Sequence, residues 1–502
     1  MTSPVRSDQF SCFQSQVQDL SRYVHESAKG SDGIHTIEQG IWQHILALGR
    51  SALGLYLSIV GDGDAGATIA LSESQASHRL PQKQHREYQS VFGHFQIKRY
   101  VFGSRVGQKI ECVPLDSRLQ LPESKFSYLL QDWDQSLAVE SPYAQVNKTL
   151  ARILGFSQSI DSLERMNRQM SQSVNAFEQA RPAATSVPSG NIIVASADGK
   201  GVPIRHRADS PTIAGHRPNR GPKPNRKKMA IVGAVYSIAP RVRTPESVLC
   251  SLFRVPQAMP NAPDTVKPQS KRVRAQLTIN SAPEAASATD QIFAWLRDQV
   301  QQRQSEIPAP VVKLMDGQPS LWQAAETTLP TNAIQVLDLL HVTSRVWQVA
   351  ALWQFPSFED TLTTVKAFVS HILNGRIKDL IITWRLLADS DTFNTSQQKL
   401  LKGICRYFQN NLHRMRYDQF LAAGYPIASG VIEGACRHVV KDRMERAGMQ
   451  WSMQGAQAML NIRAVALNQD WTTFNNFRVQ HENERLYPYR NRLKAGHPAL
   501  VA

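Results

Sequence analysis

Apolar residues recur along this chain with two different periods, and the changes of period divide it into regions. Between Ile37 and Ile59 they follow in steps of three and four, which predicts one long amphipathic helix beginning near Thr36. Thr36 and Gln39 fit a capping box at its start. The helical period stops in a Gly/Asp run at 61–66, a composition typical of a turn after a helix.

A period of two appears next. Alternating apolar residues over 95–102 and 108–113, separated by Gly-Ser-Arg-Val-Gly, predict a β-hairpin within 91–113. Its lysines and arginines would suit a ribbon lying along DNA, although a solvated polar face explains them equally well.

A helical period returns before residue 180 and contains a short break. The segment SPYAQVNKTLARILGFSQSIDSLERMNRQM predicts two helices joined at Gly155, with Ser159 or Asp161 capping the second. This is the outline of a helix-turn-helix, which makes the second helix a candidate for reading DNA. Its polar residues are Arg165, Asn167, Arg168 and Gln169. A plain helical hairpin is the alternative interpretation.

After a small, proline-containing linker at 179–190, the chain changes to strands. Three β-rich runs are followed by a helix, a strand, a helix and a strand. The strands are predicted at 191–198, 229–238, 247–253, 311–315 and 333–337, and the helices at 284–304 and after Pro319. This β-β-β-α-β-α-β order is that of the ribonuclease H-like fold, in which the first and fourth strands are neighbours.

Helical periods fill most of the remaining chain, including the span after the fifth strand and segments beginning near Glu433 and Ser452. The predicted fold class is α/β: a ribonuclease H-like catalytic core with an all-α insertion, preceded by a mainly helical N-terminal region with a β-hairpin. The predicted regions are a helical region at 1–75, a β-hairpin and helix-turn-helix-like region at 76–180, the core at 181–341 and 425–470, the insertion at 342–424, and a C-terminal tail at 471–502.

Charge narrows the class of partner. The chain has 57 Lys and Arg against 41 Asp and Glu, a formal net charge of +16, which favours a nucleic acid or an anionic membrane. No apolar run reaches the roughly 18 residues of a membrane helix, so a membrane partner is not expected. The five cysteines form no CxxC pair, which argues against a disulfide framework and a cysteine zinc site. We therefore expect a cytoplasmic protein that binds nucleic acid.

Three acidic residues occupy positions where this strand order forms a site. Asp198 follows the first strand, Asp316 follows the fourth, and Glu433 opens a later helix. Neighbouring strands would bring the aspartates together, and the glutamate would complete a site for two Mg²⁺ ions about 3.5–4 Å apart, with Mn²⁺ as a substitute. Each residue has a structural alternative: a turn residue, a helix cap and a partner of the helix dipole, respectively.

Two further pairs of residues lie near these positions. Asp338 and His341 follow the fifth strand, and their simplest interpretation is an N-cap and a first-turn residue. Because neutral imidazole is not a typical Mg²⁺ ligand, we expect no metal bond from His341. Asp442 and Glu445 share the Glu433 helix, and their basic neighbours predict surface ion pairs.

The segments ASADGKGVPI, KLMDGQPSLW, LDLLHV and YPIASGVIEGACRHVVKDRMERAGMQW resemble the catalytic blocks of insertion-sequence transposases of the ISKra4 family. Those are DDE enzymes with a ribonuclease H-like core. The resemblance covers about residues 190–470 and implies that 342–424 is their helical insertion. It also implies that Asp338 and His341 lie beside the active site. On motif position, the catalytic and metal-binding triad falls on Asp198, Asp316 and Glu433.

Basic residues provide candidate DNA contacts. The loop at 205–228 is rich in Lys, Arg, Pro and Gly, so it is predicted to bind the DNA backbone as an unpacked arm, with a nuclear-localisation signal as the compositional alternative. RVR at 241–243 and KRVR at 271–274 are predicted to extend the positive surface. The individual candidates are Lys200, Arg217, Arg220, Lys223, Arg226, Lys227, Lys228, Arg437, Lys441, Arg165 and Arg168.

The residues and the resemblance together predict a DNA transposase. It would bind double-stranded DNA at the terminal inverted repeats of its element, cleave a strand with metal-activated water and join the 3′-hydroxyl to target DNA. By resemblance it would act as a homo-oligomer on DNA, associated with the nucleoid. Two alternatives remain: a ribonuclease H-like nuclease without strand transfer, and a non-catalytic DNA-binding relative.

Overall fold

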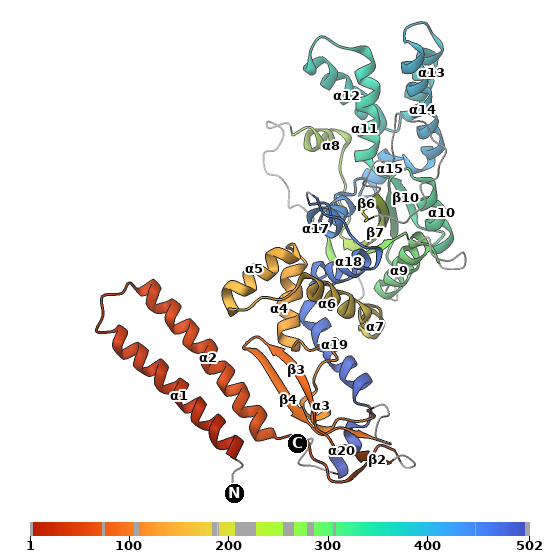
Figure 1. Cartoon of the computed structure of the whole chain (residues 1–502). Coiled ribbons are helices and arrows are strands. Elements are labelled where there is room, and N and C mark those ends of the chain that lie inside the picture. The colour runs from red at the N-terminus through yellow and green to blue at the C-terminus, as the bar shows by residue number, and fades with distance from the viewer. Residues whose placement is uncertain are drawn as a thin grey trace, which may run out of the picture. The chain divides into compact units, whose positions relative to one another are not determined.

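The computed structural model describes residues 4–72, 76–104, 110–182, 188, 190–205, 227–254, 266–278, 286–304, 308–446 and 448–496. They form a mixed α/β structure (Figure 1). The chain divides into two compact units, Met1–Phe177 with Trp471–Ala502, and Glu178–Asp470. Within the described ranges, no helix combines the length and the apolar character that crossing a bilayer requires.

The first unit begins with two long helices, which the sequence pattern predicted only in part. α1 (Pro4–Ser27) occupies a stretch where a few apolar residues at helical spacing stand among many polar ones, and α2 (Ile34–Val60) begins earlier than expected. The N-cap of α2 is Gly33, so the capping box predicted at Thr36 does not form. The helix ends as predicted, at Gly61, whose φ of 84° suits a residue without a side chain.

The β-hairpin of this unit lies one strand earlier than predicted. β3 (Gln84–Ser90) pairs antiparallel with β4 (Gly93–Arg99), and Gly93 has a φ of 117° at the turn. The predicted second strand at 108–113 provides an isolated bridge at Cys112. The strand β3 was missed because its sequence, QHREYQS, lacks alternating apolar residues.

Shorter elements complete the first unit, including a sheet with the order β1-β2-β5. The predicted helix pair forms as α5 and α6, with Gly155 ending the first and Ser159 capping the second. The C-terminal stretch contains two helices, α19 and α20. The bounds are β1 (Thr68–Ala70), β2 (Ala76–Arg79), β5 (Phe102–Gly103), α3 (Pro114–Leu119), α4 (Tyr128–Ala138), α5 (Tyr143–Leu154), α6 (Ile160–Gln172), α7 (Val174–Ala180), α19 (Trp471–Leu486) and α20 (Arg490–Gly496).

The second unit is built on a five-stranded sheet with the order β10-β9-β6-β7-β8. Its strands are β6 (Ile192–Pro203), β7 (Lys227–Ile238), β8 (Gln269–Leu277), β9 (Val311–Met315) and β10 (Ile334–Leu337). The central strand β6 pairs antiparallel with β7 along its whole length, but parallel with β9 only from Ile193 to Ala195. The first and fourth strands are therefore neighbours, as the predicted strand order required.

The third strand of this sheet lies elsewhere than predicted. The run SVLCSLF at 247–253 forms a helix, α8 (Pro245–Leu252). Thr244 and Ser247 cap this helix reciprocally, and proline fits its first turn. The apolar run alone is compatible with a strand or a helix, and the cap decides between them.

The strand that takes this place, β8, contains the basic run KRVR at 271–274. Arg272 is buried, donates Nη2 to Glu178 (3.1 Å), and forms an ion pair with Asp470 (Nη2 to Oδ2, 2.6 Å). It therefore holds neighbouring segments together, and the expectation that it contributes to a positive surface was wrong.

Helices cover both faces of the sheet. Ile193 and Ala195 of β6 pack with α9 and α10, whereas Ile192 and Val194 face the helical insertion. The bounds are α9 (Ala288–Arg303), α10 (Pro319–Thr328), α11 (Leu339–Ala350), η2 (Ala351–Trp353), α12 (Phe358–Leu373), α13 (Ile377–Asp389), α14 (Thr395–Asn411), η3 (Leu412–Arg414), α15 (Tyr417–Ala422), α16 (Gly430–Ala435), η4 (Cys436–Lys441), α17 (Asp442–Met444) and α18 (Met453–Leu467).

The insertion has a buried aromatic core that provides a test of its packing. Trp384 is fully buried, with ring centroids 5.2 Å from Phe368 and 5.9 Å from Phe408, and its Nε1 finds no acceptor among the described residues. We expect Trp384→Ala to lower the free energy of unfolding by about 3–5 kcal/mol. Trp384→Phe should cost roughly 1 kcal/mol or less, because it also removes an unpaired N–H. Chemical denaturation measures both, and equal losses would contradict this packing.

Candidate active site

Asp198 lies on β6, and Asp316 is the residue directly after the neighbouring parallel strand β9. β6 and β9 stay paired up to Ala195 and Lys313, and the same register continued by three residues reaches the two aspartates. Asp198 shares the sheet face of Val194, which packs against the helical insertion, because side chains alternate along a strand. Burial raises the pKa of Asp316 and the charge of Asp198 raises it further, so the two carboxylates interact.

Glu433 lies on α16 near Asp198 and Asp338, and its side chain is only partly shielded from solvent. Burial raises its pKa, and the charges of Asp338 and Asp198 add to this effect. Among the described residues, ligand atoms of Asp338, His341 and Glu433 all lie within 4.8 Å of one another. The group close enough to share one ion is thus this trio, and the two aspartates of the predicted triad are electrostatically coupled to it.

Asp338 is completely buried and its oxygens serve the fold. Oδ1 caps α11 by accepting from the Leu340 N–H at 2.9 Å, and Oδ2 accepts from the Ser429 hydroxyl at 2.6 Å. His341 Nδ1 lies 3.3 Å from Oδ2, and this hydrogen bond raises the pKa of His341. The N-cap interpretation of Asp338 is confirmed. The same carboxylate also holds the start of the helix that carries Glu433.

The aspartates of the predicted triad accept fewer hydrogen bonds than Asp338 does. Asp198 accepts from the Gly199 N–H at Oδ1 (2.7 Å) and from the Cys436 thiol at Oδ2 (3.4 Å), and Asp316 Oδ1 accepts from the Gln318 N–H at 3.0 Å. Within the described ranges, no Lys, Arg or His side chain forms an ion pair with Asp198, Asp316 or Glu433. Carboxylate oxygens without a compensating cation are a donor set that fits a hard divalent ion such as Mg²⁺.

Trp322 of α10 and Tyr407 of the helical insertion support the loop that follows Asp316. Trp322 Nε1 donates to the Asp316 carbonyl oxygen at 2.5 Å. A Cβ atom on Gly317 would lie 2.2 Å from Tyr407 of α14, so this position accepts glycine alone without rearrangement. Burial, with the charge of Asp316, raises the pKa of Tyr407 to about 12, so this tyrosine packs against the loop as a neutral group.

The helix that carries Glu433 widens into a π-helical segment, η4. The buried Arg463 of α18 donates Nε to the Val439 carbonyl at 3.0 Å and Nη2 to the His438 carbonyl. These bonds satisfy carbonyl groups in a segment whose hydrogen-bonding pattern departs from that of an α-helix. Short π-helical segments occur frequently at functional sites.

Cys436 and Ser429 contact the acidic site but were not predicted to do so. Cys436 lies three residues after Glu433, so helical spacing offered a signal for it. Burial raises the pKa of its thiol, which therefore remains protonated and donates to Asp198. The hydrogen bond from Ser429 to Asp338 joins residues on either side of the insertion, so no local sequence pattern predicts it.

Several predicted DNA contacts lie on the same unit as the acids. Lys200 follows Asp198 by two residues and shares its face of β6. Lys227 and Lys228 are exposed at the start of β7, and Lys227 Nζ lies 2.7 Å from Glu445. Arg217, Arg220, Lys223 and Arg226 lie outside the described residues.

The remaining candidates on this unit are on η4. Arg437 and Lys441 are exposed. Arg437 Nε lies 3.4 Å and His438 Nδ1 lies 2.9 Å from the carboxylate of Asp442. The ion pairs predicted for Asp442 and Glu445 therefore form, although with partners other than their immediate sequence neighbours.

The predicted reading helix belongs to the other unit. Arg165 on α6 is exposed and pairs with Asp161, and Arg168 is half-buried. Asn167 is buried and donates Nδ2 to Gln135 at 2.9 Å. Its expected place on a DNA-reading surface was wrong, because the residue is part of the packing between α4 and α6.

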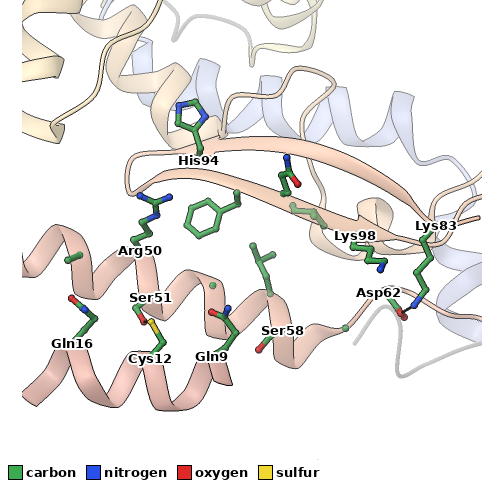
Figure 2. A pocket seen from close by; sticks show the side chains of 17 residues that line it. Gln9, Cys12, Gln16, Arg50, Ser51, Ser58, Asp62, Lys83, His94 and Lys98 are labelled. Carbon is green, nitrogen blue, oxygen red and sulfur yellow. Dashed lines mark hydrogen bonds and ion pairs between the residues drawn. The ribbon is translucent and has the colours of Figure 1, made fainter. Parts of the chain in front are cut away.

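A cavity of about 1060 Å³ lies in the first unit and offers a different environment (Figure 2). It is lined by α1, α2 and β4, with Arg50, His94 and Lys98 among its polar residues. Its acidic residue Asp62 is paired with Lys83 at 2.5 Å. The lining lacks a group of unpaired carboxylates, so the chemistry of the acidic site has no counterpart there.

Comparison with known proteins adds no relative to this picture. No protein-family model matches the chain, and no curated protein matches it. The resemblance of the catalytic segments to a transposase family therefore stays a prediction, and the site itself is the basis for any proposal about function.

The raised pKa of Asp316 gives a test of charge crowding in the site. The pKa of Asp316 is higher in the folded protein than its ordinary value of 3.8, so the folded state loses stability as the pH rises from 3.8 through the folded pKa. We expect Asp316→Asn to raise Tm by roughly 1–3 °C at about pH 7 with metal chelated, and to have little effect at about pH 4. For Asp442, hydrogen bonds from His438 and Arg437 outweigh burial and lower the pKa, so Asp442→Asn should lower Tm instead. A fall in Tm for both variants would contradict the crowding.

His341 gives a test of opposite sign. Its pKa is raised by the hydrogen bond to Asp338, so the pair stabilises the fold below about pH 6.5, and this contribution is lost as the pH rises through the folded pKa. We therefore expect His341→Asn to lower Tm more at about pH 6 than at about pH 9. Thermal unfolding in chelator at both values measures the difference, and an equal loss would exclude the charged pair.

Proposed function

We propose that this chain is a DDE transposase, which cleaves a DNA strand and joins the 3′-hydroxyl to target DNA. The observation that carries the proposal is the arrangement of three carboxylates. Asp198 lies on β6 and Asp316 directly follows the neighbouring parallel strand β9, and the two carboxylates interact. Glu433 interacts with Asp198 from a helix that follows an all-helical insertion. Separate regions of the sequence thus contribute to one acidic site, and among the described residues its three carboxylates form no ion pair with Lys, Arg or His.

The order of the sheet supports a ribonuclease H-like core. Numbered along the chain from β6, the strands have the order 5-4-1-2-3, and the second strand is antiparallel to the first. Helices α9 and α10 connect the third to the fourth strand and the fourth to the fifth. This is the order that the β-β-β-α-β-α-β pattern led us to expect, with one extra helix, α8.

The residues of the site divide into two roles. Asp198, Asp316 and Glu433 are the proposed ligands of Mg²⁺, for which Mn²⁺ substitutes. Two Mg²⁺ ions bound at such a site would activate the attacking oxygen and stabilise the leaving oxygen. Asp338 is a positioning residue, because both of its oxygens are used within the fold. Lys200, on the face of Asp198, is suited to contact a DNA phosphate.

Strand cleavage and joining by the full chain tests the proposal. The substrates are DNA carrying the element ends, and the same DNA pre-cut to expose its 3′-hydroxyl, each with and without Mg²⁺. We expect Asp198→Asn, Asp316→Asn and Glu433→Gln to reduce both reactions to the level seen without Mg²⁺, because each removes a charged ligand. DNA binding, measured by fluorescence anisotropy, should be retained.

Asp442→Asn is the matched control, since it removes an acid of the same helical segment that is already ion-paired. It should cleave and join like the unaltered chain. Hydrolysis without joined product on pre-cut ends would replace the transposase with a nuclease. Mg²⁺-dependent cleavage by the Asp316→Asn variant would show that the proposed site is wrong. DNA binding without any cleavage by the unaltered chain would indicate a non-catalytic DNA-binding protein.

A further inference from the structure

The first unit exposes an apolar stripe along α2. Ile34, Ile45, Tyr56 and Ile59 are large apolar side chains with exposed fractions of 78%, 41%, 52% and 57%. Their spacing of 11, 11 and 3 residues places them within about 60° of one another around the helix. They therefore lie along one side of the helix, with Ile34, Ile45 and Tyr56 each about 16 Å from the next, whereas singly scattered apolar residues would need no explanation.

A second stripe runs along α1. Phe10, Val17 and Val24 are exposed by 50%, 44% and 44%, and they lie seven residues apart. Phe13 and Leu20 are half-buried and alternate with them. Apolar residues in alternating steps of three and four are the pattern of a helix that packs along another helix.

The two helices meet each other through different residues. The Ser51 hydroxyl donates to Cys12 Sγ at 3.6 Å, and a Cβ atom on Gly40 would lie 1.9 Å from the Tyr23 hydroxyl oxygen. Among the described side chains of α1 and α2, Ser51 alone is buried. The hairpin thus buries no apolar core of its own, although amphipathic helices gain most of their stability by covering such residues.

Both stripes lie on one side of the hairpin. On α2, the cavity-lining Ala47 and Gly54 are each two residues from Ile45 and Tyr56, and two residues turn a helix by about 200°. The α2 stripe therefore points away from the cavity of Figure 2. On α1, the stripe is rotated by roughly 130° from Cys12 and Tyr23, which contact α2, and on α2 the stripe is rotated by roughly 120° from Ser51 and Gly40 in the same sense along the chain. Because the helices are antiparallel, both rotations are toward the same side.

The size of this side of the hairpin matches a protein interface. With 24 residues in α1 and 27 in α2, the hairpin is roughly 35–40 Å long and about 20 Å wide, so one side covers roughly 700–800 Å² with its polar residues included. A standard interface buries about 800 Å² on each partner.

Charge favours a second copy of the chain over DNA or a membrane as the partner. Residues 4–60 hold four Lys or Arg and five Asp or Glu, in a chain whose net charge is +16. A nearly neutral hairpin does not attract DNA phosphates, and it lacks the basic polar face of helices that bind membrane surfaces. Two such hairpins do not repel each other.

We propose that the α1–α2 hairpins of two copies pack face to face into a four-helix bundle, which dimerises the chain without DNA. A twofold axis lets each face meet the same face of the other copy. The proposal does not rest on the transposase function, because it concerns the unit that lacks the acidic site.

The mass of the full chain in solution tests this dimer. Sedimentation or light scattering at micromolar concentration, after nuclease treatment and without DNA, should give the mass of two chains. Val17→Glu and Ile45→Glu place a charge in the face and should each shift the mass to one chain. Ser15→Glu and Gln43→Glu are matched controls, because they add the same charge at exposed positions two residues away, on the opposite side of the same helices, and they should remain dimeric.

Circular dichroism and thermal unfolding of each variant check that the helices form. A dimer that is lost in the two face variants and kept in the two controls supports the proposal. An unaltered chain that is monomeric at these concentrations overturns it, as does a dimer that persists in both face variants. Binding of a monomeric chain to neutral or anionic phospholipid vesicles, lost in Val17→Glu, would assign the face to a membrane instead.

Discussion

The acidic site depends on one buried carboxylate, that of Asp338. A charged group without solvent costs several kcal/mol unless hydrogen bonds replace its hydration. Here the Leu340 N–H, the Ser429 hydroxyl and N–H, and the His341 ring supply those bonds. Because Leu340 stands at the entry of the helical insertion and Ser429 at its exit, the same bonds close the insertion at its base. The large insertion therefore does not separate Glu433 from the sheet.

Neighbouring carboxylates in this site differ in what they contribute to stability, and the groups around each carboxylate cause the difference. Asp338 is saturated with donors and stabilises the fold, whereas Asp316 and Glu433 have raised pKa values and no cation partner among the described residues. A fold that retains such crowding loses stability, as expected where function and stability compete. Asp198 and Asp316 both lie beyond Ala195 and Lys313, the last residues at which β6 and β9 pair.

The sequence predicts buried, strongly patterned elements better than elements defined by polar contacts. The strand at 311–315 and its place beside β6 follow from apolar runs and strand order. The strand β8 was missed because its buried Arg272 resembles a surface residue until its acidic partners are known. α1 was missed because its apolar residues lie exposed on an otherwise polar helix. The same limit applies to the site, where the bond between Ser429 and Asp338 joins residues on either side of the insertion and only the folded chain brings them together.

The distribution of arginine explains why net charge alone is a poor guide to binding surfaces here. Arg272, Arg443 and Arg463 are buried and hold carboxylates, an aromatic ring and backbone carbonyls. Such guanidinium groups count toward +16 but present no charge to DNA. The N-terminal hairpin is nearly neutral as well, so attraction for a polyanion must come from the exposed lysines and arginines elsewhere in the chain. That separation leaves the hairpin available for contact with protein, while the exposed basic residues of β7 and η4 belong to the unit that holds the carboxylates.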